Sequence, residues 1–286
     1  MKKILLHLER DAKASVFDQI TAYDAGVDQV IACGGVTPEE VTNLVYGVMF
    51  TRGGDNLRNS AIFVGGTQVA DAERLMERVL QTFFGPFRVS VMFDANGCNT
   101  TAAAAVQKLA RGRNLAGKKA LVLAGTGPVG TRIATLLARE GCQVLLSSRY
   151  LSRAQEVCQR LETQAKVKVE PVQVSGGEEA GRALAGVNVL VCCGAPGARL
   201  IEEATWAKQD SLEIMADINA VEPLGIEGIK ATDDGKERQG KVAYGAIAIG
   251  NLKMKIHKAA IQALFRSNDQ VLDLEAIYAL AGEMGE

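Results

Sequence analysis

A glycine-rich turn near the middle of the chain restricts the possible fold more than any other feature of the sequence. It follows an apolar segment at 120–124, precedes a helical segment at 131–140, and a second apolar segment starts at 143. A G-x-G-x-x-G turn between a strand and a helix is typical of a Rossmann unit that binds a dinucleotide pyrophosphate. Its residues are Gly125, Thr126, Gly127, Pro128, Val129 and Gly130.

Each glycine of this turn has a separate expected role. Gly125 permits the tight turn, Gly127 lets the backbone approach the pyrophosphate, and Gly130 lets the helix pack close to the strand. The start of the following helix then offers free N–H groups and a positive dipole end to the phosphates. The alternative is an ordinary tight turn without a ligand.

Strand-like and helical segments alternate along the chain, which favours an α/β fold with parallel sheets. A polar stretch with two glycines, 111–119, separates two parts. We predict an α/β domain at 1–112 and a Rossmann-type domain at 113–252. The helices within 253–286 are expected to pack back on the first domain, which would leave a cleft between two lobes.

Local signals define several element ends. Ser15 is a candidate N-cap for a helix at 15–25, and Thr37 with Glu40 forms a capping-box pattern. A helix at 99–109 is expected to start with Asn99 or Thr100 as its cap. Residues 241–249 read as a continuing strand pattern, with a closing helix from 253.

Composition excludes several classes of function. The 286 residues carry a net charge of −1, and 48% are hydrophobic, so the basic surface that nucleic acids require is not expected. No uninterrupted apolar stretch of about 18 residues suggests a membrane span. None of the six cysteines forms a C-x-x-C pair and the two histidines are far apart, so we expect no metal site and free thiols in a reducing cytoplasm.

The end of the second Rossmann strand predicts which nicotinamide cofactor is used. An NAD enzyme usually has a carboxylate there for the ribose 2′-hydroxyl, whereas this chain has Ser147, Ser148 and Arg149, followed by Arg153. Hydroxyl and guanidinium groups suit a 2′-phosphate. NADP is therefore predicted over NAD, against the alternative that Arg149 is only a solvated residue at a helix start.

The sequence shows no obvious acid–base group for oxidising an alcohol. There is no Tyr-x-x-x-Lys pair, and His257, in a basic helical stretch, reads as a structural histidine. This leaves open a hydride transfer in which positioning supplies most of the effect. Two segments, 93–101 and 245–253, are candidate site loops; the alternatives are a capped helix start and a strand–turn.

At these segments the chain resembles the bacterial NADP-dependent methylene-tetrahydromethanopterin and methylene-tetrahydrofolate dehydrogenases of one-carbon metabolism. The resemblance extends over essentially the whole length. The matching segments are 15–18, 23–26, 51–54, 61–66, 83–90, 99–104, 123–130 and 245–257.

The resemblance implies an oxidoreductase that removes a hydride from the methylene carbon between two pterin nitrogens. The product would be a methenyl cation, and no hydroxyl proton is released, which accounts for the missing base. The functional lysine of the family corresponds to Lys253, with Lys255 as a neighbouring alternative. The implied partners are a reduced pterin and further copies of the chain. Expected substrate contacts are Asp18, Asp94, Asn99 and Thr100, and further expected cofactor contacts are Asn219, Gly245 and Ile249.

Two other functions stay open at this point. Residues 121–153 also resemble the cofactor domains of shikimate and glutamyl-tRNA reductase-type enzymes, and Cys33 or Cys98 would be the nucleophile in the latter. A non-catalytic NADP(H) sensor is the second alternative. The resemblance favours tetrahydromethanopterin as the main carrier and tetrahydrofolate as the second, and the serines before Arg149 leave room for some NAD activity.

Overall fold

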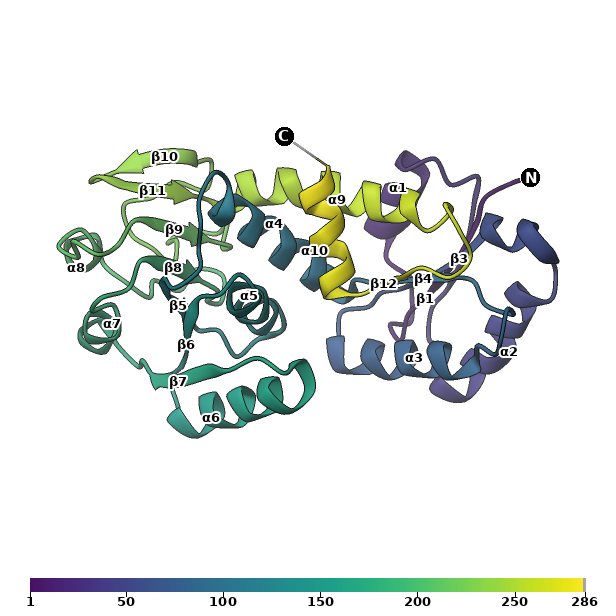
Figure 1. Ribbon diagram of the computed structural model, residues 1–286, viewed down its shortest axis with the longest axis horizontal. Helices are drawn as coiled ribbons and strands as arrows, with labels where there is room; N and C mark the ends of the chain where they lie inside the picture. The colour runs from purple at the N-terminus through teal and green to yellow at the C-terminus, as the bar shows by residue number, and fades with distance from the viewer. Residues whose placement is uncertain (285–286) are drawn as a thin grey trace. The chain divides into compact units, whose positions relative to one another are not determined.

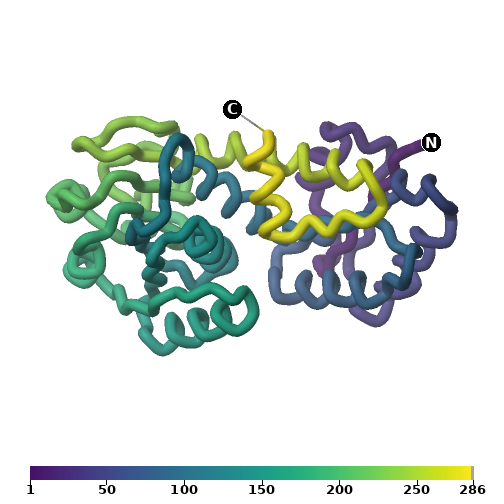
Figure 2. Tube along the Cα trace, viewed as in Figure 1, coloured from purple at the N-terminus to yellow at the C-terminus, as the bar shows by residue number. Residues whose placement is uncertain are grey.

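The computed structural model describes residues 1–284, and the chain divides into two compact units (Figures 1 and 2). Unit 1 consists of residues 1–100 and the chain from 254 onward, and unit 2 consists of residues 101–253. The two division points fall near the start of one helix and inside another. A domain boundary at 112/113 stays a prediction.

Unit 1 is built on a five-stranded parallel sheet in the order β12-β4-β3-β1-β2. Its strands alternate with helices, as a parallel sheet requires. Every residue of its middle strand, β3, is buried, as expected for a strand covered on both faces. The elements are β1 (Ile4–Leu8), α1 (Val16–Asp24), β2 (Gln29–Cys33), α2 (Pro38–Met49), η1 (Gly54–Asn59), β3 (Ser60–Val64), α3 (Val69–Thr82), β4 (Ser90–Phe93), η2 (Ala95–Gly97), β12 (Val271–Leu272) and α10 (Leu274–Glu283). Two further helices, α4 (Cys98–Ala110) and α9 (Ala246–Ala263), contain the division points and contribute residues to both units.

Unit 2 contains a seven-stranded sheet in the order β10-β11-β9-β8-β5-β6-β7. Six strands are parallel, and β10 pairs antiparallel with β11 at the edge. From β7 to β11 this is the doubly wound Rossmann order, 3-2-1-4-5-6. The elements are β5 (Lys119–Leu123), α5 (Pro128–Arg139), β6 (Gln143–Ser148), α6 (Leu151–Arg160), η3 (Leu161–Ala165), β7 (Val169–Gln173), α7 (Gly177–Ala183), β8 (Val189–Cys192), α8 (Glu203–Trp206), β9 (Ile214–Asp217), β10 (Asp234–Arg238) and β11 (Lys241–Tyr244).

The predicted α/β class with a Rossmann-type second sheet is confirmed. The core of unit 2 lies between its sheet and the helices α7 and α8, where the side chain of Trp206 is fully buried against Leu190 and Met215. The Trp206 indole N–H donates to the Glu227 carbonyl at 2.8 Å, which satisfies the polar end of this large side chain.

Two local predictions are confirmed. The Ser15 hydroxyl accepts from the Asp18 N–H and caps α1. The Glu40 carboxylate accepts from the Thr37 N–H at 2.8 Å at the start of α2, as a capping box requires.

Two other local predictions are wrong. Residues 246–249 belong to α9 rather than to a strand, so Lys253 lies inside a helix and not at its start. Neither Asn99 nor Thr100 caps α4; both lie within it, and the Asp94 carboxylate accepts from their N–H groups. A carboxylate outside the helix thus replaces the side-chain cap that the sequence suggested.

None of the helices among residues 1–284 combines the length and the apolar character needed to cross a membrane.

Candidate cofactor and substrate sites

The three glycines of the turn after β5 meet different surroundings. A Cβ atom on Gly130 would lie 2.5 Å from the Gly125 carbonyl oxygen, and one on Gly125 would lie 2.9 Å from Val122 Cγ1. Any larger residue would therefore force the helix away from the strand. A Cβ atom on Gly127 would meet no atom within 4 Å. The open side of the turn is thus at Gly127, where a pyrophosphate is expected to approach.

The start of α5 suits an anionic ligand. Gly127 is its N-cap and Pro128 its first residue, and no side chain among the described residues caps this end. Pro128 has no N–H to satisfy, so the N–H groups of Val129 and Gly130 are the donors at the helix start. Together with Thr126, these residues form a cradle that fits a pyrophosphate group.

The residue before the turn, Ala124, has a left-handed backbone with φ 51°. Its N–H donates to the Ser147 hydroxyl at 3.0 Å, and the Gly125 N–H donates to the Ser147 carbonyl at 2.9 Å. Ser147 is 1% exposed. The structure therefore gives Ser147 a role in holding the turn, which the sequence analysis did not foresee.

The two predicted arginines are exposed after β6. The Ser148 hydroxyl accepts from the Tyr150 N–H at 3.4 Å, a long and weak bond. Arg149 and Arg153 are exposed, and neither forms an ion pair within residues 1–284. Two guanidinium groups without carboxylate partners at this position fit a 2′-phosphate.

The remaining predicted cofactor residues have local structural roles. The Asn219 side chain bonds the Val221 backbone at 2.9 and 3.1 Å, and the Asn219 N–H donates to Asp217. Gly245 has no room for a Cβ atom, which would lie 2.2 Å from the Lys230 carbonyl oxygen. Ile249 lies in α9 and is 1% exposed. Their contacts with a cofactor stay predictions.

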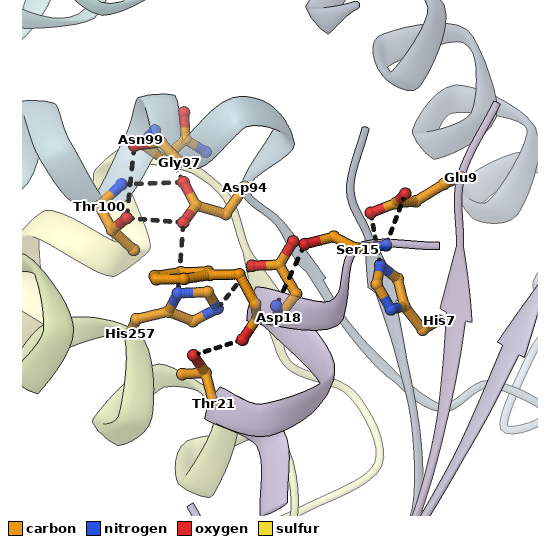
Figure 3. Close-up of polar contacts among 11 residues, drawn as sticks. His7, Glu9, Ser15, Asp18, Thr21, Asp94, Gly97, Asn99, Thr100 and His257 are labelled. Carbon is orange, nitrogen blue, oxygen red and sulfur yellow. Dashed lines mark hydrogen bonds and ion pairs between the residues drawn. The ribbon is translucent and has the colours of Figure 1, made fainter. Parts of the chain in front are cut away.

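In unit 1, three of the four predicted substrate residues form one buried cluster (Figure 3). The Asp94 carboxylate accepts from the Asn99 N–H at 2.9 Å, the Thr100 N–H at 3.0 Å and the Thr100 hydroxyl at 2.6 Å. The Asn99 side-chain amide donates to the Phe93 carbonyl at 2.8 Å. All three residues are at most 2% exposed. The cluster holds the start of α4, and a direct substrate contact for its members stays a prediction.

The fourth residue, Asp18, is connected to this cluster through His257 of α9. His257 Nε2 lies 3.9 Å from Asp18 Oδ1, and its Nδ1 lies 3.9 Å from Asp94 Oδ2. The imidazole ring stacks on Phe63 with centroids 5.7 Å apart and planes at 21°. This group could not be predicted from the sequence, because a lone histidine on a helix is usually structural and the two partners of His257 are distant in sequence.

A second buried histidine, His7 of β1, lies in the same unit (Figure 3). His7 Nε2 lies 2.8 Å from Glu9 Oε1, and the Ser15 N–H donates to Glu9 Oε2 at 3.0 Å. Ligand-type atoms of His7, Glu9 and Asp18 all lie within 4.8 Å of one another. Within this group, Glu9 bonds both His7 and the Ser15 backbone, which satisfies its two carboxylate oxygens. Sequence reasoning missed this pair as well.

Lys253 is a partly buried residue of α9. It precedes His257 by four residues, and this spacing puts both side chains on the same face of the helix. Ile249 lies one further turn before Lys253 on that face. The catalytic assignment of Lys253 stays a prediction.

The cysteines do not resemble activated nucleophiles. All six are free thiols, and burial raises the pKa of Cys33. Burial also raises the pKa of Cys142 and Cys158 to about 11. A reactive cysteine needs a lowered pKa, so the structure does not favour Cys33 as a catalytic group. Cys98 is fully buried, whereas a reactive cysteine is partly exposed.

The fold and the glycine turn define an α/β protein of the dinucleotide-binding dehydrogenase class. Two solved structures share this fold over nearly their whole length. Shikimate 5-dehydrogenase from Listeria monocytogenes matches with a TM-score of 0.52 at 13% identity, covering 98% of this chain and 96% of that one. A 5-ketofructose reductase from Gluconobacter matches with a TM-score of 0.50 at 14% identity, covering 99% of both chains. At these identities the likeness concerns the fold alone.

Sequence comparison identifies the family. The model of the methylene-tetrahydromethanopterin dehydrogenase N-terminal domain matches residues 16–96. The chain is 48% identical over 285 residues to the bifunctional protein MdtA of Methylorubrum extorquens, with 99% of both chains covered. It is 28% identical to the NAD(P)-dependent methylenetetrahydromethanopterin dehydrogenase of the same organism, also covering 99% of both. The chain belongs to the methylene-tetrahydromethanopterin dehydrogenase family, which confirms the predicted resemblance.

Proposed function

We propose that the protein is an NADP-dependent methylene-tetrahydromethanopterin dehydrogenase. The choice of substrate rests on one observation. The family match over residues 16–96 includes Asp18 and Asp94, and a carboxylate oxygen of each lies 3.9 Å from His257 in unit 1. The relative at 28% identity bears the name of this activity with NAD(P) as cofactor. The oxidoreductase class follows from the family.

The chemistry agrees with the groups in the structure. When bound, NADP⁺ accepts the hydride that the methylene carbon loses, and the carbon becomes part of a methenyl cation shared by two nitrogens. No O–H bond breaks, so no general base is required. The chain then has to position the carbon and stabilise the charge, and Lys253 and Asp18 are the residues proposed for this.

The choice of NADP rests on the end of β6. Arg149 and Arg153 are exposed there without ion-pair partners in the described chain, and none of the residues 147–149 carries a carboxylate. A 2′-phosphate would be bound by the guanidinium groups, and a 2′-hydroxyl would lack its usual carboxylate acceptor. Some activity with NAD⁺ is included in the proposal.

The proposal also includes methylene-tetrahydrofolate as a second substrate, because it shares the reacting centre and differs mainly in ring substituents and tail. The relative at 48% identity is named a bifunctional protein, which agrees with a second activity without specifying it. A homo-oligomeric state and a cytoplasmic location complete the proposal.

The test is a spectrophotometric assay of the purified protein with NADP⁺ and each methylene pterin, repeated with NAD⁺. Production of NADPH with methylene-tetrahydromethanopterin supports the proposal, and activity with the folate ranks the two carriers. Normal NADPH binding without turnover of either pterin would contradict it and would favour the NADP(H) sensor.

A further inference from the structure

We propose that His257 is a positioning residue: its imidazole, held between the Asp18 and Asp94 carboxylates, fixes the Asp18 carboxylate to accept hydrogen bonds from the N–H groups of the pterin ring. This inference rests on the proposed function, because it assumes a reduced pterin as the substrate.

Asp94 is the rigidly held member of this group. Asp94 is 1% exposed and accepts three hydrogen bonds from the start of α4. A carboxylate with this many donors and no access to water is held in one orientation. Asp94 Oδ2, which also receives the Thr100 hydroxyl, is the atom 3.9 Å from His257 Nδ1.

The imidazole ring of His257 is fully enclosed by its neighbours. His257 is 0% exposed, and Phe63 stacks against it at 21° while the Phe17 ring lies 6.3 Å away. The aromatic neighbours restrict the plane of the imidazole, and its Nδ1 lies at ion-pair distance, 3.9 Å, from Asp94 Oδ2. The opposite ring nitrogen, Nε2, is thereby directed toward Asp18 Oδ1. When protonated, an imidazole between two carboxylates attracts both of them.

Asp18 is the member of this group that can reach a ligand. Its side chain is 16% exposed, whereas those of His257 and Asp94 are 0% exposed. The Asp18 backbone is fixed by the N–H bond to the Ser15 hydroxyl at 3.2 Å. The pyrimidine part of a pterin offers N–H donors along one edge, which a carboxylate can accept together.

The charged groups around His257 come from every element of this cluster. Asp18 lies on α1, Asp94 follows β4, and the His7–Glu9 pair at the end of β1 lies next to Asp18. On α9 itself, Lys253 lies one turn before His257, and Lys258 is paired with Asp24 at 2.8 Å. Of these carboxylates, those of Asp18 and Asp94 lie 3.9 Å from His257, whereas Glu9 bonds His7.

The first experiment compares His257→Ala and His257→Gln with Lys258→Gln, which changes the next residue of the same helix. If His257 positions Asp18, His257→Ala raises the KM for the methylene pterin about tenfold or more with kcat nearly unchanged, because ground-state binding is lost. The KM for NADP⁺ stays as in the wild type. The pterin KM of His257→Gln, which keeps a planar polar group, should lie between those of the wild type and His257→Ala. Lys258→Gln should have the wild-type KM.

A double-mutant cycle with Asp18→Asn tests whether His257 acts through Asp18. We expect His257→Ala to add little to the KM already raised by Asp18→Asn, because the two changes remove the same contact. Increases in KM that multiply, or an unchanged pterin KM in His257→Ala, would overturn the proposal.

A spectroscopic readout distinguishes this inference from the proposed function. The chain has two histidines, so ¹³C-labelled imidazoles give two signals, and His7→Gln assigns them. The titration midpoint of His257 is expected to fall in Asp18→Asn and in Asp94→Asn, because each variant removes an opposite charge. An unchanged midpoint in Asp18→Asn would overturn the positioning role, whereas wild-type protein inactive with both pterins would overturn the proposed function instead.

Discussion

At the scale of single residues, the arginine after β6 allows a sharp test of cofactor choice. Arg149→Ala is expected to weaken NADP⁺ binding about tenfold or more, since a charge-assisted hydrogen bond contributes roughly 1.5–3 kcal/mol. NAD⁺ lacks the 2′-phosphate, so its affinity should stay the same. Calorimetric titration with both cofactors measures this, with Arg160→Ala, which changes an exposed arginine at the end of α6, as the control. Equal losses for the two cofactors would assign Arg149 another role.

Ser147 provides a second residue-scale prediction, which concerns stability. Ser147→Ala removes the acceptor of the Ala124 N–H next to a left-handed backbone at φ 51°. Leaving that donor without its partner should lower the free energy of unfolding by about 1–3 kcal/mol. Ser148→Ala loses only the 3.4 Å bond from the Tyr150 N–H, so its free energy of unfolding should fall by less. Urea unfolding measures the free energy of unfolding of both variants. Similar losses would show that the bond from the Ala124 N–H contributes no more than the bond from the Tyr150 N–H.

At this scale, a residue's role could be predicted when its contacts lie close to it in the sequence. Gly125 and Gly130 were predictable because the close approach of the two glycines occurs within one turn. The role of His257 was not, since its partners Asp18 and Asp94 come from other elements. The three predicted residues Asp94, Asn99 and Thr100 do lie together, but hydrogen bonding to each other accounts for their proximity.

At the scale of elements, the β10–β11 pair depends on a buried ion pair that ties it to its preceding loop. The Asp233 carboxylate, 3% exposed, accepts from Arg238 at 2.6 and 2.9 Å and from the Lys230 N–H at 2.8 Å. Burial acts to raise the pKa of Asp233, but these donors outweigh it and hold the pKa below the ordinary 3.8. The ionised carboxylate therefore stabilises the fold above that pH, and the contribution is lost as the pH falls through the lowered pKa.

Asp233→Asn should consequently lower the free energy of unfolding by about 1.5–3 kcal/mol at neutral pH, with a smaller difference toward acid pH. The control is Asp234→Asn, the next residue, whose half-exposed side chain pairs with Lys108 and should contribute less than about 1 kcal/mol. Denaturant unfolding at several pH values measures both. A difference between wild type and Asp233→Asn that stays constant down to acid pH would argue against a role for the charge.

The elements that could not be predicted from the sequence lack a local pattern that matches their structure. The first turn of α9 alternates small and β-branched residues, which resembles a strand, yet the Ile247 N–H donates to the Ala231 carbonyl and Ala248 and Ile249 are buried. Tertiary contacts thus override local propensity there. Similarly, β10 is almost fully exposed and β12 has two residues, so neither leaves a hydrophobic pattern.

At the scale of the whole molecule, the order of the second sheet followed from its motif and that of the first did not. A G-x-G-x-x-G turn belongs to the first strand of a doubly wound sheet, and right-handed crossovers then restrict the order of the others. For unit 1, the sequence indicated alternating strands and helices only. Its edge strand β12 comes from the C-terminal part of the chain and pairs with β4. No local sequence pattern predicts this pairing.

The division into two units leads to a prediction about thermal unfolding. The proposed cofactor contacts around the glycine turn and β6 lie in residues 101–253, so NADP⁺ at about one hundred times its Kd should stabilise that unit by roughly 2.7 kcal/mol. Differential scanning calorimetry should show the higher unfolding temperature. Gly127→Ala is the matched control: its Cβ atom meets nothing within 4 Å and the backbone, at φ −80°, accepts alanine. The variant should therefore unfold like the wild type without cofactor and lose the response to NADP⁺, because the methyl group occupies the side of the turn open to the pyrophosphate. A full response in Gly127→Ala would place the pyrophosphate elsewhere.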